Sequence, residues 1–200
     1  MDKAAHMLLT WDNNADANSQ SQVCPLVQGE TFYLRSTFQK KLDQLAQNGT
    51  TLLTPLIDLS HGMQDAGKPL VKTAIQMGAR RKAARRAFEK ALERQQACLA
   101  EIKAIGRRAL AELEADPDKF AAILFSRPYN GFVEEAHMGI PNKFASRGIQ
   151  VIPLDFLDLE DERSKPHMYW GMGKMMMKAA RLVERHPQLF GTYITNFSCG

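Results

Sequence analysis

The chain has 200 residues, of which 44% are hydrophobic, and a modest formal net charge of +4. This length can bury a core without disulfides or metal ions to hold it together. No apolar run approaches the roughly 20 residues of a membrane helix, and the first apolar run is too short for a signal peptide. We therefore expect a cytoplasmic protein without a membrane segment, whose three cysteines stay reduced.

The N-terminal part, residues 1–66, predicts a strand, a loop containing a cysteine, and a helix. The apolar run His6–Trp11 predicts a short strand, and a polar loop with turn-forming residues follows it. Cys24 lies at the end of this loop. A helix is expected over residues 30–47, where apolar side chains recur at helical spacing. Residues 51–59 predict an edge strand or an extended segment, because their proline disfavours a central strand.

The middle segment, residues 67–116, is rich in strong helix formers and predicts one long basic amphipathic helix, with a break near Gly78 or Gly106. Cys98 follows the apolar spacing of this helix, so we expect it to be a core thiol. The basic run over residues 80–86 precedes several glutamates and contains no aromatic residue. This composition favours a solvated face or a docking face for a partner subunit over nucleic-acid binding.

The C-terminal part, residues 117–200, alternates between strand and helix patterns. Short apolar runs predict three strands and amphipathic runs predict two helices between them, which gives a βαβαβ unit with strands at 120–126, 149–153 and 192–197 and helices at 140–147 and 168–185. Short connections of this kind indicate a parallel sheet. We predict an α/β fold: a Rossmann-like or flavodoxin-like parallel sheet with helices on both faces, with the long helix inserted before it.

The carboxyl ends of parallel strands are where ligands bind in such sheets. Arg127, Tyr129 and Asn130 follow the first C-terminal strand, and Cys199 follows the last. Cys24 comes after a strand and before a helix, where a thiolate is stabilised by the helix dipole. The loop at Arg127 has two interpretations: it lines a ligand pocket, or it is a structural turn in which the arginine pairs with a carboxylate.

Other polar and aromatic residues near these strand ends have less specific interpretations. His167, Tyr169 and Trp170 could line the same cavity, although aromatic packing on the sheet is the simpler explanation. Asp155 and Asp158 are expected to be cap and turn residues rather than catalytic acids. The sequence contains no glycine-rich phosphate loop of the known types.

Four sequence blocks, taken in order, resemble the large acyl-CoA dehydratase activase-related proteins. The central and C-terminal regions of these proteins resemble 2-hydroxyacyl-CoA dehydratase subunits, and double-cubane cluster proteins are relatives. The blocks are CPLVQGETFYLRSTF (24–38), SRPYN (126–130), GIPNKFASRGIQVIPLDFL (139–157) and MYWGMGKMMMKAARL with TYITNFSCG (168–200). Ser126 and Ser198 stand where the family usually has glycine. Because the family continues beyond the last Cys-Gly and carries ATP-binding activase modules, we expect a fragment or a split gene product.

This resemblance implies that Cys24 and Cys199 ligate an iron–sulfur cluster, of the [4Fe-4S] or double-cubane type. A cubane takes about four cysteine ligands, so the remaining ligands would come from downstream sequence, a partner chain or a second copy. The resemblance also implies that Arg127, Tyr129 and Asn130 shape a pocket at the cluster or at a CoA-linked acyl group.

The function expected from these observations is the iron–sulfur electron-transfer portion of an acyl-CoA dehydratase activase-related reductase system. Low-potential electrons would come from an ATP-dependent activase, on a separate or fused domain, and a CoA ester is the implied substrate. The chain would then be part of a reductase or 2-hydroxyacyl-CoA dehydratase system rather than active alone. The alternative is a cluster-free scaffold that docks a partner through its basic helix; no nucleic acid is expected to bind.

Overall fold

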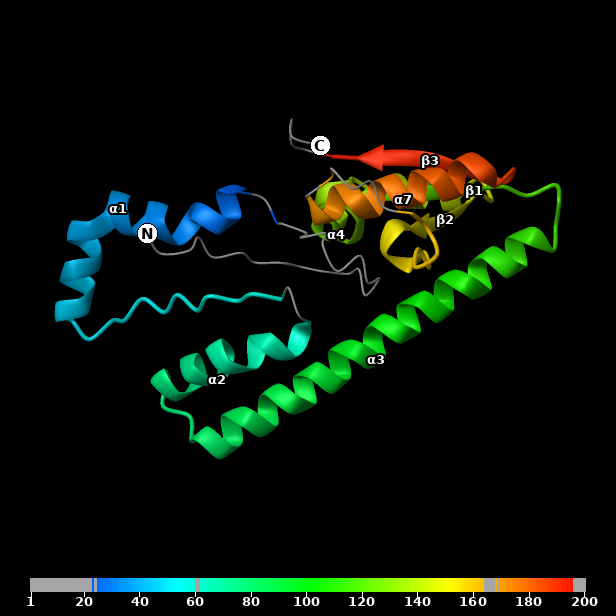
Figure 1. The fold of residues 1–200 in the computed structure, drawn as a ribbon. Helices are drawn as coiled ribbons and strands as arrows, with labels where there is room; N and C mark the ends of the chain where they lie inside the picture. Colours follow the sequence, from blue (N-terminus) through cyan, green and yellow to red (C-terminus); the bar gives the residue numbers. More distant parts are fainter. Residues whose placement is uncertain (1–22, 24, 60–61, 164–167, 169, 196–200) are drawn as a thin grey trace. The chain divides into compact units, whose positions relative to one another are not determined.

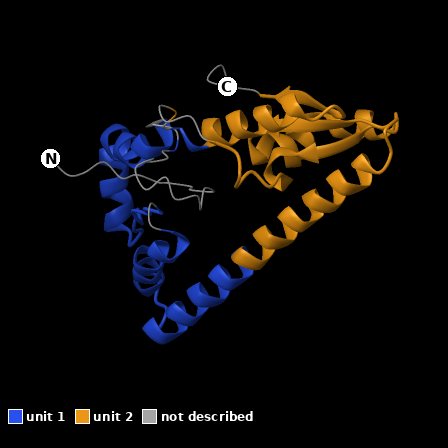
Figure 2. Cartoon of the chain, turned by 45° about the vertical axis from the view of Figure 1, so that its right-hand side comes forward, with its two compact units in different colours: residues 1–95, 169–171 blue, residues 96–168, 172–200 orange. Residues whose placement is uncertain are grey.

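The computed structural model describes residues 23, 25–59, 62–163, 168 and 170–195. The chain divides into two compact units, which Figure 2 shows in different colours. Unit 1 contains residues 1–95 and 169–171, and unit 2 contains residues 96–168 and 172–200. Among the described residues, no helix has the length and apolar composition needed to cross a membrane. The predicted strand at His6–Trp11 lies outside the described residues.

Unit 1 is built from helices joined by an irregular segment (Figure 1). Helix α1 (Pro25–Gln47) confirms the predicted helix and begins five residues before the expected start. It is kinked at Phe38, whose backbone angles are not helical. Its aromatic side chains are exposed rather than buried, since Phe32 is 61% and Phe38 is 53% exposed. Residues 51–59 contain no strand, so of the two alternatives for this segment, an edge strand or an extended segment, the edge strand was wrong.

The middle segment forms two main helices. A short 3-10 turn (η1, Met63–Ala66) leads into α2 (Gly67–Gln76), and α3 (Arg81–Glu114) follows. The chain breaks at Gly78, whose φ of +96° is a conformation that favours glycine. It does not break at Gly106, which lies within α3.

The expectation that Cys98 is a core thiol was wrong, because the structure places this side chain in an exposed position on α3. The more buried line along this helix repeats every seven residues, at Leu92, Leu99, Gly106 and Leu113. Cys98 is one position away from that line, a rotation of about 100° around the helix axis.

Unit 2 contains a three-stranded parallel sheet in the order β2-β1-β3. Its strands are β1 (Ala121–Ser126), β2 (Gln150–Pro153) and β3 (Leu189–Ile194), so all three predicted strands are confirmed, the last beginning three residues earlier than expected. Short helices α4 (Pro128–Phe132), α5 (Glu134–His137) and α6 (Ile140–Ala145) join β1 to β2. The 3-10 turn η2 (Leu154–Phe156) and α7 (Gly171–Arg185) join β2 to β3.

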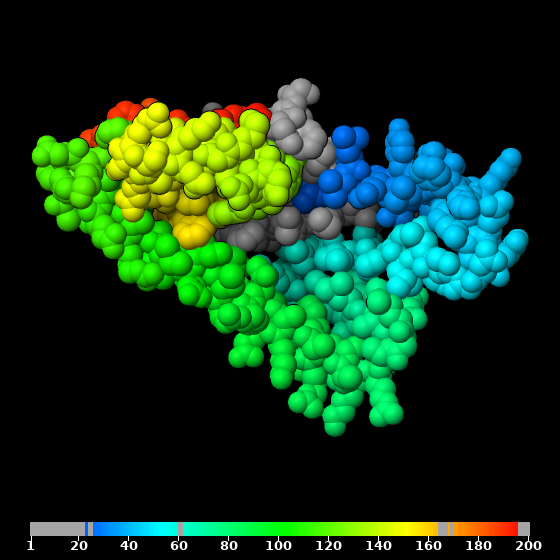
Figure 3. Space-filling model, turned by 180° about the vertical axis from the view of Figure 1, so that it is seen from behind, coloured from blue at the N-terminus to red at the C-terminus, as the bar shows by residue number. Residues whose placement is uncertain are grey.

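The two faces of the sheet pack against different helices. Ala121 and Ile123 belong to a core cluster that also contains Leu113 of α3 and Met175 and Ala179 of α7. On the other face of β1, Leu124 and Ser126 lie next to Gly131 of α4. Figure 1 shows α7 on one side of the sheet, and Figure 3 shows the segment between β1 and β2 covering the opposite side. The connection from β1 to β2 and the connection from β2 to β3 run in opposite directions across the sheet. If both crossovers are right-handed, their helices must lie on opposite faces.

The side chain of Gln188 bridges the C-terminal end of α3 and the segment that follows it. The Gln188 side-chain amide donates hydrogen bonds to the carbonyl oxygens of Leu113, Asp116 and Lys119, at 2.9, 2.8 and 3.0 Å. The last carbonyls of a helix have no partner within the helix, and a side-chain donor can satisfy them. Gln188 therefore holds together the connection between α3, β1 and the start of β3.

Candidate functional site

The carboxyl ends of the three strands lie side by side in unit 2. In the parallel register, Ser126 at the end of β1 is opposite Ile194 of β3, and Leu124 is opposite Pro153 of β2. Because the chain goes from the central strand β1 first to one neighbour and later to the other, the helices that follow β1 and β2 lie on opposite faces of the sheet. Such a reversal opens a crevice outside the strand ends, where ligands bind in open α/β sheets.

Two of the predicted site residues are held together at this edge. Arg127 has an extended backbone and directly precedes α4. Its guanidinium donates a hydrogen bond to the hydroxyl oxygen of Tyr129 at 3.0 Å. The Tyr129 side chain is 45% exposed, so a polar surface of guanidinium and phenol lies at the end of β1.

Asn130, the third predicted site residue, is buried. Only 1% of it is exposed, and neither its amide nitrogen nor its amide oxygen has a hydrogen-bond partner among the described residues. A buried polar group without a partner costs about 1–3 kcal/mol, and the great majority of such groups in native proteins are satisfied. An unsatisfied amide at a strand end is therefore the strongest sign in this unit of a position that receives a ligand.

The end of β1 is closely packed around this asparagine. Ser126 is 2% exposed, and a side chain at Gly131 would overlap the Ser126 hydroxyl oxygen. The hydroxyl of Ser126 is accommodated because residue 131 has no Cβ. The serine at residue 126 is thus matched by the neighbouring glycine at residue 131.

Asp155 lies two residues beyond the end of β2. It is 7% exposed, and its Oδ2 atom has no partner among the described residues. Burial raises the pKa of the Asp155 carboxyl above its ordinary value, while its own backbone N–H and the positive charge of Lys103 act in the opposite direction. The buried side-chain atoms without a partner in the described part of the chain belong to Asn130 and Asp155 alone. The prediction that Asp155 is a simple cap or turn residue does not account for this burial.

The loop that follows Asp155 is held by basic side chains from two helices. From α3, Lys103 donates to the carbonyl oxygen of Leu157, and Arg107 forms an ion pair with Asp158 at 2.8 Å. Burial lowers the pKa of the Lys103 ammonium, and nearby carboxylates, Asp158 first, oppose this effect.

Helix α7 holds the other side of this loop. Its basic residues lie at positions 174, 178, 181 and 185, which is the spacing of one helix face. Lys178 donates to the carbonyl oxygen of Leu159 at 3.4 Å, Arg181 donates to the carbonyl oxygen of Arg163, and Arg185 pairs with Glu162. Lys174 and Lys178 are only 3% and 4% exposed. Sequence reasoning missed this cluster, although the four-residue spacing of the lysines was a usable signal.

The predicted metal ligands Cys24 and Cys199 lie outside the described residues, as do His167 and Tyr169. Cys199 belongs to the segment that follows β3 in the sequence, and β3 pairs with β1 up to Ser126. Within the described part of the chain, no three histidine, cysteine, aspartate or glutamate side chains are grouped to hold a metal ion. The structure therefore brings the Arg127 and Tyr129 side chains into contact and buries the Asn130 side chain separately, and the predicted ligand pair stays a prediction.

Comparison with known proteins identifies one family. Residues 7–157 match the model of the CoA enzyme activase uncharacterised domain, DUF2229. This match spans both units and includes Asn130 and Asp155. No curated protein and no solved structure matched the chain.

Proposed function

The chain belongs to the family of the CoA enzyme activase uncharacterised domain, DUF2229, and from this premise we propose that it is an iron–sulfur electron-transfer module. It would form part of an acyl-CoA dehydratase activase-related reductase system. The observation that carries this proposal is the buried, unsatisfied amide of Asn130 at the carboxyl end of β1. The strand β3 pairs with β1 as far as Ile194, and the sequence that follows β3 contains Cys199.

The chemistry of the residues at this edge fits an iron–sulfur cluster. Cluster sulfurs accept hydrogen bonds, and N–H groups around them tune the reduction potential. Asn130 can donate two such bonds, and Arg127 with Tyr129 supplies polar groups at the mouth of the same edge. The cluster itself would supply one-electron transfer, with Cys24 and Cys199 as ligands in this chain and the other ligands outside it.

The strand order supports a flavodoxin-like fold for unit 2. The order β2-β1-β3 is the beginning of the flavodoxin-like order, in which cofactors sit at the switch point between the first and third strands. In the proposed system, an ATP-dependent activase delivers electrons at this edge, and a CoA ester or a second cluster receives them. Arg127 and Tyr129 would then orient the acceptor.

Anaerobic reconstitution with iron and sulfide tests the cluster directly. We expect visible charge-transfer absorbance in the wild type and its loss in Cys24→Ala and Cys199→Ala. Cys98→Ala is the matched control, because this thiol is exposed on α3 and should leave the absorbance unchanged. Absence of absorbance in the full chain supplied with its activase partner, or equal losses in all three variants, would contradict the proposal.

The scaffold alternative has one observation in its favour. The basic side chains of residues 80–82, 85 and 86 are all exposed on the first turns of α3 and its approach. A cluster-free scaffold predicts that a double Cys24→Ala, Cys199→Ala variant binds the activase as the wild type does. It also predicts salt-sensitive loss of binding when Arg85 and Arg86 are changed to glutamine.

A further inference from the structure

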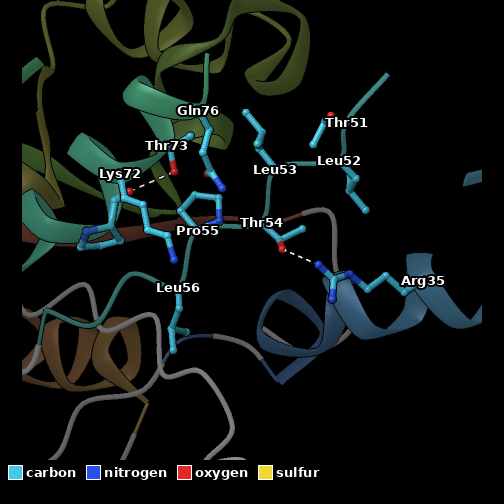
Figure 4. Close-up of a pocket in the computed structure, with 11 residues that line it drawn as sticks. Arg35, Thr51, Leu52, Leu53, Thr54, Pro55, Leu56, Lys72, Thr73 and Gln76 are labelled. Atoms are coloured by element: carbon cyan, nitrogen blue, oxygen red, sulfur yellow. Dashed lines mark hydrogen bonds between the residues drawn. The ribbon is translucent and has the colours of Figure 1, made fainter. Parts of the chain in front are cut away.

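Unit 1 contains a cavity of about 420 Å³ between α1, α2 and the irregular segment after α1. Figure 4 shows its lining. The residues that line it are Arg35, Thr51, Leu52, Leu53, Thr54, Pro55, Leu56, Pro69, Lys72, Thr73 and Gln76. None of the residues discussed for the strand ends in unit 2 takes part in it.

The charge of this lining has one sign. Arg35 and Lys72 are cationic, and the lining contains no aspartate or glutamate. Figure 4 shows the Arg35 guanidinium reaching toward Thr54 from one side and the Lys72 side chain running past Pro55 from another. Two cations without a carboxylate between them attract an anion, most strongly one that carries more than one charge.

Helix α2 presents one face to the cavity. Pro69, Lys72, Thr73 and Gln76 have the spacing of residues that lie above one another on a helix. The Thr73 hydroxyl donates to the carbonyl oxygen of Pro69 at 2.9 Å, so its hydrogen is already used. From this helix, the Lys72 ammonium and the Gln76 amide remain as donors for a ligand.

The opposite wall offers further donors. Arg35 donates to the hydroxyl oxygen of Thr54 at 2.8 Å, which fixes the guanidinium at the wall and leaves the Thr54 hydrogen available. Backbone N–H groups of residues 52–54 and 56 have no main-chain partner among the described residues. Backbone N–H groups require a partner, and those of this irregular segment can donate to oxygen atoms of an anion.

A second hollow on the other side of this segment provides a contrast. It shares Arg35, Thr51 and Leu52 with the first but also includes Asp43. The Asp43 carboxylate accepts a hydrogen bond from Gln39 at 3.3 Å. A carboxylate in the lining repels an anion, so the hollow that contains Lys72 is the one suited to it.

We propose that the cavity between α1, α2 and residues 51–56 binds a small organic phosphate. Arg35 and Lys72 hold the phosphate oxygens, the N–H groups of residues 52–54 supplement them, and the organic part packs on Leu53, Pro55, Leu56 and Pro69. Because part of the lining is apolar, the cavity should bind an organic phosphate more tightly than inorganic phosphate. The proposal is independent of the cluster assigned to unit 2.

Calorimetric titration of the full chain with phenyl phosphate tests this site. We expect saturable binding by the wild type, weakened about tenfold by Arg35→Gln and by Lys72→Gln, since each removes one charged hydrogen-bond donor. Lys68→Gln is the matched control: it removes the same charge one turn earlier on α2, outside the lining. Its affinity should stay within about twofold of the wild type, because an exposed charge outside the site contributes little.

Three further measurements decide between a site and general charge attraction. Lys72→Arg keeps the charge and a hydrogen-bond donor and should retain binding. This result would show that Lys72→Gln weakens binding because it removes the charged donor and not because a substitution at this position disturbs the fold. Phenol and inorganic phosphate should both bind more weakly than phenyl phosphate. Wild-type protein that gives no saturable heat, equal losses in Lys68→Gln and Lys72→Gln, or phenol that binds as well as phenyl phosphate would overturn the proposal.

Discussion

Gly106 of α3 lies directly against the carbonyl oxygen of Phe156, so close that a Cβ at residue 106 would overlap that oxygen. The contact brings the helix backbone onto the turn that follows β2. One helical turn earlier, Lys103 donates to the carbonyl oxygen of Leu157 in the same loop. A glycine inside a helix is less favourable than alanine by about 0.5–1 kcal/mol. Here the close approach of the two segments accounts for its presence.

Replacement of Gly106 by alanine should therefore destabilise unit 2. The added methyl group must displace backbone rather than a flexible side chain, and overpacking of this kind costs about 1–3 kcal/mol. Denaturant unfolding followed by circular dichroism measures the change. Gly29→Ala is the matched control, because no atom lies within 4 Å of that Cβ position in α1. It should leave stability unchanged or raise it slightly, and equal effects of both variants would contradict the contact.

The long helix illustrates what the sequence could and could not predict. Helix-forming composition was enough to place α3, and the left-handed conformation of Gly78 agrees with the break suggested there. The same reasoning could not separate Gly78 from Gly106, because both are single glycines in a helical pattern. Only the position of Phe156, distant in sequence, shows that Gly106 is needed for packing.

The candidate site shows a similar division. Apolar runs located the strands, and the rule about carboxyl ends then selected Arg127, Tyr129 and Asn130. Burial was not predictable from this position: Tyr129 is half exposed, whereas Asn130, one residue later, is enclosed. Asp155 was overlooked as a buried carboxyl because its burial depends on packing with segments distant in sequence, such as α3, whose Gly106 lies against the adjacent Phe156.

Asp155→Asn should stabilise the protein at neutral pH. Burial raises the pKa of the Asp155 carboxyl above its ordinary 3.8, so the folded state holds this proton more tightly than the unfolded state. The stability from this group is complete below pH 3.8 and is lost as pH rises through the folded-state pKa. Asparagine does not titrate. The free energy of unfolding of the variant should therefore rise relative to that of the wild type as pH increases through this range. Unfolding free energies measured from acidic to neutral pH give this difference directly.

Asp158→Asn is the control for this measurement. Asp158 is exposed and pairs with Arg107, so its replacement should lower stability slightly, by at most about 1 kcal/mol. The two variants are therefore expected to differ in sign, although both remove one carboxylate near Lys103. A pH-independent difference between Asp155→Asn and the wild type would refute the assignment of a raised pKa.

Asn130→Leu should separate stability from function. Leucine has the same branching as asparagine but no polar atoms, so it removes two buried groups that have no partner. Replacing such a group by an apolar one of similar shape is neutral or stabilising, and we expect a gain of about 1 kcal/mol in the free energy of unfolding. An amide that has no partner in the free protein but binds the ligand lowers stability in exchange for function, as functional sites often do. The stabilised variant should accordingly lose the reconstituted cluster absorbance.

Asn142→Leu, at an exposed position of α6, should change neither the stability nor the cluster absorbance. A destabilised Asn130→Leu variant that keeps the absorbance would show instead that this amide serves the fold.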